Sequence, residues 1–410
     1  MLLMNLNVTA NAISPSKRTL SGFERSLHLD RTCRNLHNAL FGTGDRRRGS
    51  NVKRSWWKTL LKYGIGFLLL ALVIWRNWQA KPGHPGTGLE DMLHRPMQVK
   101  WYLLAAVLCG LNIFATLVRW YVLVRAQQLP FSFGSAMGIG LVGYFFNTFL
   151  PGSVGGDLVK AAFIAREQSR RTVAVSTVVI DRVVGLWGLV ALIAAIGGIY
   201  WISDPSFIQS KPTLLICVSA AIAVVAASLA VWFLLGFLPE RRAIRFSERL
   251  HSIPRIGGIL SEFWQAVWMY RNRGLSILVA LLLSWASHLC WVSQFYLCVL
   301  TFQPAGMPAD MPSLAEHFLI VPMGMIAQGF IPLPGGIGGG EFVFGELYRV
   351  LGHPEAIGVS GSMGWRTLAW SFGLVGYITY LLMKRGAVPL PKATNAASPA
   401  PSAPANATGP

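Results

Sequence analysis

Charged residues are scarce in this sequence. Asp, Glu, Lys and Arg make up 13% of the 410 residues, and hydrophobic residues make up 53%, whereas soluble domains carry about 25% charged residues. Several apolar runs reach the ~18 to 20 residues that cross a bilayer. The runs are continuous rather than alternating, which argues against the strands of a membrane β-barrel. The composition therefore predicts an all-α polytopic membrane protein.

Acidic residues are the scarcer of the two charge types. The chain has 36 basic and 17 acidic residues, a formal net charge of +19. A basic chain can bind nucleic acid or an anionic membrane surface. The arginines lie between apolar runs, and no zinc finger, RNA-binding signature or basic helix–turn–helix is visible. We expect membrane lipids, mainly anionic ones, as partners, and no nucleic acid.

Motifs for metal or nucleophile chemistry are missing as well. The five cysteines are scattered, without a CxxC pair, and are best interpreted as small buried hydrophobic residues. No His, Cys and carboxylate cluster has metal-ligand spacing, and no G-x-S-x-G or Cys/His arrangement indicates a nucleophile. We expect no metal and no cofactor. Whether the chain is an enzyme stays open, with the balance against it.

The apolar runs define a membrane domain over residues 51–386. Before it lies a basic tail (residues 1–50) and after it a Pro/Ala-rich tail (387–410), and both have the composition of disordered segments. Six runs predict membrane spans: residues 59–75, 101–124, 173–199, 213–237, 274–300 and 357–383. Lys and Arg concentrate in the connections that share a side with the N-terminus. The positive-inside rule then predicts a multi-pass protein of the cell's cytoplasmic (inner) membrane with both termini cytoplasmic.

Two apolar stretches, residues 133–165 and 314–351, are interrupted by proline and glycine. The orientation above requires each stretch to start and finish on the same side, as a re-entrant hairpin or a pair of short crossings. Irregular backbone is not tolerated facing lipid, although it is tolerated where it lines a protein-enclosed cavity. We therefore expect both interrupted stretches to face an interior site.

The two interruptions resemble each other. NTFLPGSVGGD (147–157) and QGFIPLPGGIGGGE (328–341) both run amide, any residue, Phe, aliphatic, Pro, Gly-rich turn, carboxylate. Arg182 follows Asp157 by 25 residues, and Arg366 follows Glu341 by the same interval. The spans before the two stretches run in opposite directions. This pattern predicts an inverted repeat whose broken elements meet near the middle of the membrane.

The residue types at the interruptions suit an anion. Proline stops a helix and glycine lets the backbone turn sharply. Free amides in such a turn, with the start of a helix behind them, form an anion-binding nest. A guanidinium binds phosphate oxygens bidentately, and an arginine inside a membrane is a functional candidate by default. The two arginines are therefore candidate phosphate ligands.

A structural interpretation stays open beside the functional one. Asp157 can pair with Arg182, and Glu341 with Arg366, as buried ion pairs that hold the hairpins in place. Arg119, at the end of a span, is expected to extend to the cytoplasmic interface, and His288 to form a hydrogen bond inside the bundle. The basic connection 241–258 is expected to contact an anionic lipid surface.

Three blocks, NTFLPGSVGGDLVKAAFI, DRVVGL and PLPGGIGGGEFVFGELY, resemble the signature blocks of the lysylphosphatidylglycerol synthase transmembrane family, also called flippase-like. The resemblance covers residues 51–386. It implies a helical bundle with re-entrant hairpins around a cavity, and a role in moving a lipid between leaflets. The motif positions, which the resemblance implies to be substrate-binding, are Asn147, Pro151, Gly155, Gly156, Asp157, Arg182, Pro334, Gly335, Gly336, Glu341 and Arg366.

The synthases of this family carry a soluble aminoacyltransferase domain after the membrane domain. Here 25 residues follow Arg385, so we expect no aminoacylation by this chain. The leading hypothesis is binding or translocation of an anionic phospho- or glycolipid. Two alternatives remain: a membrane enzyme acting on lipid phosphates, and a membrane subunit for a lipid-modifying transferase encoded separately.

Overall fold

The computed structural model describes residues 56–384 except 151–154, 169, 254–256, 272 and 304–310. Its contacts divide the chain into two units, Met1–Lys53 and Arg54–Pro410. All described residues belong to the second unit. The predicted tails, residues 1–50 and 387–410, lie outside the described residues.

The described part of the chain is helical, as the apolar runs predict. The helices are α2 (Trp56–Arg76), α3 (Leu89–His94), α4 (Val99–Ala126), α5 (Phe133–Phe149), α6 (Gly155–Glu167), α7 (Arg171–Ser203), α8 (Pro205–Gln209), α9 (Pro212–Phe237), α10 (Glu240–His251), α11 (Gly257–Arg271), α12 (Gly274–Thr301), α13 (Leu314–Gly329), α14 (Gly339–Leu351) and α15 (Glu355–Lys384).

Long helices occupy all six predicted spans. Among the described residues, α4, α7, α9 and α12 are long and apolar enough to cross a membrane. Helices α2, with 21 residues, and α15, with 30, lie where the first and last spans were predicted. The chain is an all-α polytopic membrane protein. The sidedness of its termini stays a prediction.

Both interrupted stretches form two helices with a break between them. In the first stretch α5 precedes the break and α6 follows it, and in the second α13 and α14 do the same. Ser132 caps α5 by accepting a hydrogen bond from the amide of Ser135 at 3.1 Å, and Ser313 and Glu316 cap α13 reciprocally. Each such cap contributes about 1 kcal/mol. How deeply the two breaks enter the bilayer stays a prediction.

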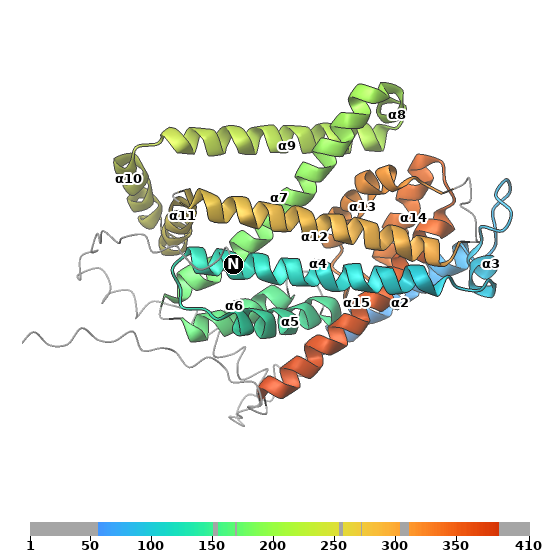
Figure 1. Cartoon of the computed structure of the whole chain (residues 1–410), viewed down its shortest axis with the longest axis horizontal. Coiled ribbons are helices and arrows are strands. Elements are labelled where there is room, and N and C mark those ends of the chain that lie inside the picture. The colour runs from blue at the N-terminus through green and yellow to red at the C-terminus, as the bar shows by residue number, and fades with distance from the viewer. Residues whose placement is uncertain are drawn as a thin grey trace, which may run out of the picture. The chain divides into compact units, whose positions relative to one another are not determined.

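The helix contacts follow the predicted repeat. Helices α4 to α7 correspond to α12 to α15. Helix α4 packs along α12, and the two helices run in opposite directions (Figure 1). Helix α5 packs on α15 and α13 packs on α7, so each broken stretch lies against the span that follows the other one. The pairs α5–α6 and α6–α7 likewise have counterparts in α13–α14 and α14–α15. A two-fold relation between the repeats predicts that each of these contacts has such a counterpart.

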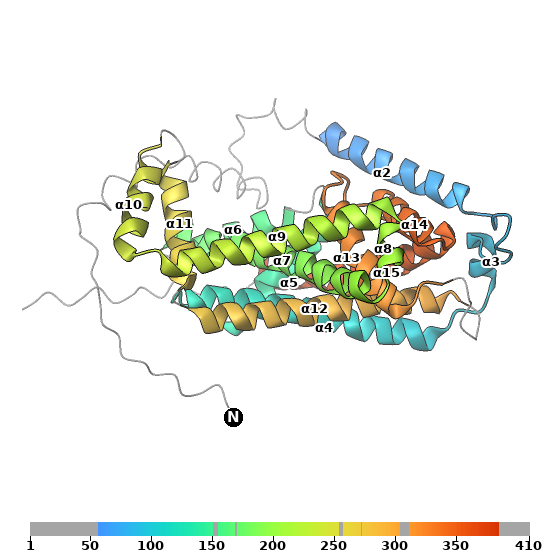
Figure 2. The ribbon, with the colours of Figure 1, turned by 90° about the horizontal axis from the view of Figure 1, so that it is seen from above.

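Small residues let these helices approach closely. A Cβ added at Gly358 of α15 would lie 2.5 Å from the carbonyl oxygen of Phe344 in α14, and one at Gly361 would lie 2.4 Å from the side chain of Val299 in α12. Lipid gives helices no hydrophobic drive to associate, so close packing has to supply the attraction. The largest core cluster forms here, around the buried rings of Phe295, Phe344 and Tyr348. Helix α2 lies at the edge of the bundle and contacts α14 (Figure 2).

Candidate functional site

The second break lies against the end of α5, where the first break begins. A Cβ placed on Gly335, in the second break, would lie 2.5 Å from the carbonyl oxygen of Thr148, at the end of α5. Helix α2 touches both: Tyr63 donates a hydrogen bond to the carbonyl oxygen of Phe149, and a Cβ at Gly66 would lie 3.3 Å from the carbonyl oxygen of Ile337. The proximity predicted from the repeat is therefore present.

Side chains of the first motif hold the first break together. The amide of Gly156 donates to Oδ1 of Asn147 at 2.7 Å across the break. Gly156 has no room for a side chain, because a Cβ there would lie 1.9 Å from the carbonyl oxygen of Gly143. Gly155 begins α6, and Pro151 lies outside the described residues. Sequence and packing together fix where α6 starts.

Asp157 and Arg182 form the first ion pair. Nε of Arg182 donates to Oδ2 of Asp157. Lys160, one turn further along α6, is buried and lies over the ring of Trp120, 5.2 Å from its centroid. Among the described residues no carboxylate pairs with Lys160. The first break thus carries two cations and one carboxylate.

Glu341 and Arg366 form the second ion pair. Nε and Nη2 of Arg366 both donate to the carboxylate, the latter at 2.9 Å. The same guanidinium donates to the carbonyl oxygens of Gly335 at 2.7 Å and Gly336 at 3.2 Å. These glycines have φ of +54° and +66°, a backbone region that favours glycine. Pro334, just before them, is buried. One side chain therefore binds the carboxylate and two carbonyl oxygens of the turn.

The second turn satisfies its own anion-binding groups. The amide of Gly338, just before α14, donates to Oε2 of Glu341 at 2.8 Å. The carboxylate therefore occupies the position that a nest would offer to an external anion. At the position equivalent to Lys160, α14 carries Phe344, which is fully buried. Charge in the second break is balanced and enclosed.

The two guanidinium groups differ in access. The side chain of Arg182 is 42% exposed, whereas that of Arg366 is 5% exposed. The exposed neighbours of Arg182 on α7 are the apolar side chains Val179, Val183 and Leu186. A guanidinium stays charged at every relevant pH. The first break therefore presents positive charge on an apolar face.

Gln328 spans the second break as Asn147 spans the first, although the Gln328 amide donates where the Asn147 amide accepts. Its Nε2 donates to the carbonyl oxygen of Gly335 at 3.2 Å, so an amide side chain spans each turn. The candidate set taken from the sequence omitted Gln328. The repeated amide at the start of both motifs was the signal that identifies it.

The expected interfacial position of Arg119 is wrong. Its side chain is 6% exposed and donates from Nε to Oδ1 of Asp181 at 2.8 Å and from Nη1 to Ser284 at 3.1 Å. A buried carboxylate compensates the charge and removes the need to reach water. Asp181 and Arg182 are adjacent, so α7 directs one ion pair toward α4 and the other toward α6. The ion pair between α7 and α4 was not predicted from the sequence.

The predicted role of His288 inside the bundle is confirmed. Its Nε2 lies 3.0 Å from the carbonyl oxygen of Gly185 and 3.2 Å from Oγ of Ser284. A Cβ at Gly188 would lie 2.6 Å from Oγ of Ser284. The pair Ser284 and His288 has the i, i+4 spacing that places both on one helix face.

Glu167, the last residue of α6, lies outside the spans and has buried carboxylate oxygens without a hydrogen-bond partner in the described structure. Burial raises its pKa to about 7, because a charged carboxylate is poorly solvated there. In the same part of the chain, no group of three His, Cys, Asp or Glu side chains is placed to hold a metal ion.

The fold and the paired breaks define a polytopic membrane protein with a charged interior. Residues 54–376 match the family model described as Lysylphosphatidylglycerol synthase TM region. The match covers well over half of the chain, and the protein belongs to this family. It is also similar to the UPF0104 membrane protein PH1989 of Pyrococcus horikoshii, with 24% identity over 339 residues, which cover 77% of this chain and 95% of that relative.

Proposed function

We propose that this membrane protein binds the headgroup of an anionic phospho- or glycolipid at the first break and moves it between the leaflets. The observation that carries the proposal is the difference between the two breaks. The side chain of Arg182 is 42% exposed and that of Arg366 is 5% exposed, and Lys160, one turn after Asp157 on α6, pairs with no carboxylate among the described residues. An anionic headgroup would complete the charge balance of the first break.

The chemistry of the group fits phosphate. A guanidinium presents donors in a planar fork that matches phosphate oxygens, and charge-assisted hydrogen bonds of this kind are among the strongest in proteins. The apolar side chains around Arg182 suit acyl chains rather than a soluble anion. Because Nε of Arg182 holds Asp157, a headgroup would share or displace that carboxylate. The ion pair then acts as a gate and not solely as a structural contact.

The test is the transfer of a labelled lipid between leaflets. Full-length protein is reconstituted into vesicles that contain fluorescent phosphatidylglycerol, and dithionite then bleaches the label in the outer leaflet. R182Q and K160Q should each slow transfer roughly tenfold or more, since each removes one charged hydrogen-bond donor. R170Q is the matched control, because Arg170 is an exposed arginine just before the same helix, and it should transfer at the unmodified rate.

Fluorescent phosphatidylcholine, which carries no net charge, should transfer more slowly than phosphatidylglycerol in the unmodified protein. R182K, which keeps the charge but loses the planar fork, should fall between R182Q and the unmodified protein. A folded R182Q variant that transfers phosphatidylglycerol at the unmodified rate contradicts the proposal.

A further inference from the structure

The chain between α9 and α12 forms a helical hairpin, α10–α11. Nε1 of Trp264 in α11 donates to the carbonyl oxygen of Ala243 in α10 at 3.1 Å, and the hydroxyls of Ser247 and Ser261 lie 2.9 Å apart. The ring of Phe246 packs edge-on against Trp264, with centroids 4.7 Å apart. The sequence predicted a basic connection here, and the structure gives it two defined helices.

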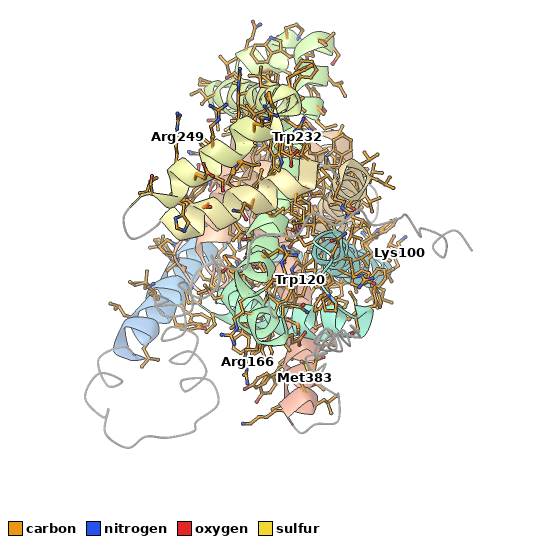
Figure 3. All side chains as sticks on the ribbon, turned by 90° about the vertical axis from the view of Figure 1, so that its left-hand side faces the viewer. Lys100, Trp120, Arg166, Trp232, Arg249 and Met383 are labelled. Atoms are coloured by element: carbon orange, nitrogen blue, oxygen red, sulfur yellow. The ribbon has the colours of Figure 1, made fainter. Side chains whose placement is uncertain are left out.

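The outer face of α10 is basic. The arginines of this helix, all exposed, are Arg241, Arg242, Arg245 and Arg249, against two exposed glutamates, Glu240 and Glu248. The small residues Ala243 and Ser247 face α11, so the arginines lie on the other side of the helix. Ile244 is 52% exposed and Phe246 is 44% exposed at the two margins of this basic face. Figure 3 looks onto this end of the bundle and labels Arg249.

A hollow of about 240 Å³ lies where the hairpin joins α9. Trp232 of α9 and Trp264 and Trp268 of α11 line it, together with Arg271. Figure 3 labels Trp232 on this side of the bundle. Drug-sized ligands occupy about 300–1,000 Å³, so the hollow takes part of an acyl chain and not a whole lipid.

Arg271 is the charged group of this hollow. Its guanidinium lies 4.4 Å from the ring centroid of Trp268 and donates to the carbonyl oxygens of Leu238, at 3.3 Å, and Gly236 at the end of α9. An arginine has five N–H donors, so these two bonds leave donors for a further acceptor. The hollow therefore combines an aromatic wall with one partly used guanidinium. The basic face of α10 lies outside its lining, and α10 begins two residues after Leu238, whose carbonyl oxygen accepts from Arg271.

We propose that the junction of α9 with the α10–α11 hairpin binds one anionic glycerophospholipid, distinct from the lipid at the first break. An acyl chain lies against Trp232, Trp264 and Trp268, the phosphate is bound by Arg271, and the exposed arginines of α10 attract the anionic headgroup to this junction. Three features support this occupant. Tryptophan collects at the level of lipid headgroups, basic residues on an amphipathic helix beside a span attract anionic lipid, and the hollow opens at the end of an apolar helix.

Arg271 also caps the last carbonyls of α9. A cap is independent of lipid charge, and it does not involve the exposed arginines of α10. Variants at Arg242 and Arg245 therefore separate the two roles, because both side chains are exposed and neither bonds to α9 or α11 among the described residues.

The experiment uses full-length protein purified in detergent and stripped of lipid. Dioleoyl-phosphatidylglycerol or dioleoyl-phosphatidylcholine is added, and lipid adducts are counted by native mass spectrometry. All variants are compared in the R182Q background, which removes the binding expected at the first break. There the R242Q/R245Q double variant should bind phosphatidylglycerol about one order of magnitude more weakly than R182Q alone, and R271Q should lose the remaining adduct. R166Q, which removes an exposed arginine at the end of α6, is the matched control and should bind as R182Q alone does.

Brominated phosphatidylglycerol gives an independent measure, because bromine quenches tryptophan fluorescence at contact. W268F should reduce the quenching that phosphatidylglycerol causes and leave the smaller effect of brominated phosphatidylcholine unchanged. If both lipids bind equally well, or if R242Q/R245Q binds phosphatidylglycerol as tightly as R166Q does, the proposal is overturned. Should R271Q fail to fold, the double variant still decides the outcome.

Discussion

Replacing Gly335 with alanine tests whether the two breaks meet as the structure shows. Gly335 has φ of +54°, and a Cβ there would lie 2.5 Å from the carbonyl oxygen of Thr148. Two costs follow. A non-glycine residue in the left-handed region loses about 1–2 kcal/mol, and overpacking against fixed neighbours costs about 1–3 kcal/mol more. We expect G335A to lower the free energy of unfolding by about 2–5 kcal/mol.

Gly352 offers a matched control. Its φ is +91° at the end of α14, and a Cβ there would meet nothing within 4 Å. G352A therefore carries the backbone cost alone, about 1–2 kcal/mol. The difference between G335A and G352A isolates the contact with Thr148.

The assay is unfolding of the full-length protein by SDS titration from mild detergent micelles, followed by circular dichroism. G335A should unfold at a clearly lower SDS fraction than G352A. Equal losses in the two variants would show that the breaks do not touch, and the proposed meeting point would have to be abandoned.

Three further predictions concern buried charges. R366Q leaves a fully buried carboxylate without its partner and should lower the free energy of unfolding by about 3–5 kcal/mol. R182Q changes a half-exposed pair and should lower it by about 1 kcal/mol or less. Thermal unfolding in detergent compares the two variants. R119Q should lower the free energy of unfolding by about 3–5 kcal/mol, because it leaves the buried carboxylate of Asp181 unpaired. The double variant R119Q/D181N should regain part of that stability, because it leaves no buried charge unpaired. E167Q should be more stable than the unmodified protein by about 1–2 kcal/mol at pH 8, after allowance for partial exposure, and equal to it at pH 4.

The sign of the Glu167 effect follows from its raised pKa. The unfolded chain loses this proton near the ordinary value of 4.5 and the folded chain near 7, so the unmodified protein loses stability as the pH rises between these values. A stability difference that is the same at pH 4 and pH 8 contradicts this account. For the arginine variants, equal losses in R366Q and R182Q, or a double variant no better than R119Q, count against the assigned pairs.

Much of the fold follows from the sequence because lipid imposes strict rules. Apolar runs predict the long helices, since backbone groups inside a bilayer have to be satisfied within the segment. The breaks after Phe149 and Gly329 were predicted from proline and glycine, and the pairing of Asp157 with Arg182 was one of the two alternatives that the equal spacing suggested. In each case local chemistry determines the structure.

Features that depend on distant partners were not predicted. Arg119 near the end of an apolar run is typical of an interfacial residue, and its carboxylate partner, Asp181, lies 62 residues away. Asp181 is adjacent to Arg182 in the chain, and helix geometry directs the two side chains to different neighbours. The different exposure of Arg182 and Arg366 likewise depends on how α2, α6 and α14 pack, which no local pattern records.

The most direct test of the central claim maps where an anionic lipid binds. Full-length protein in vesicles is irradiated with photoactivatable phosphatidylglycerol, and the cross-linked peptides are identified by mass spectrometry. The account predicts cross-links on α6 and α7 beside Arg182 that disappear in R182Q and persist in R170Q. Cross-links that are absent from α6 and α7 in the unmodified protein, or that are unchanged in R182Q, would contradict it.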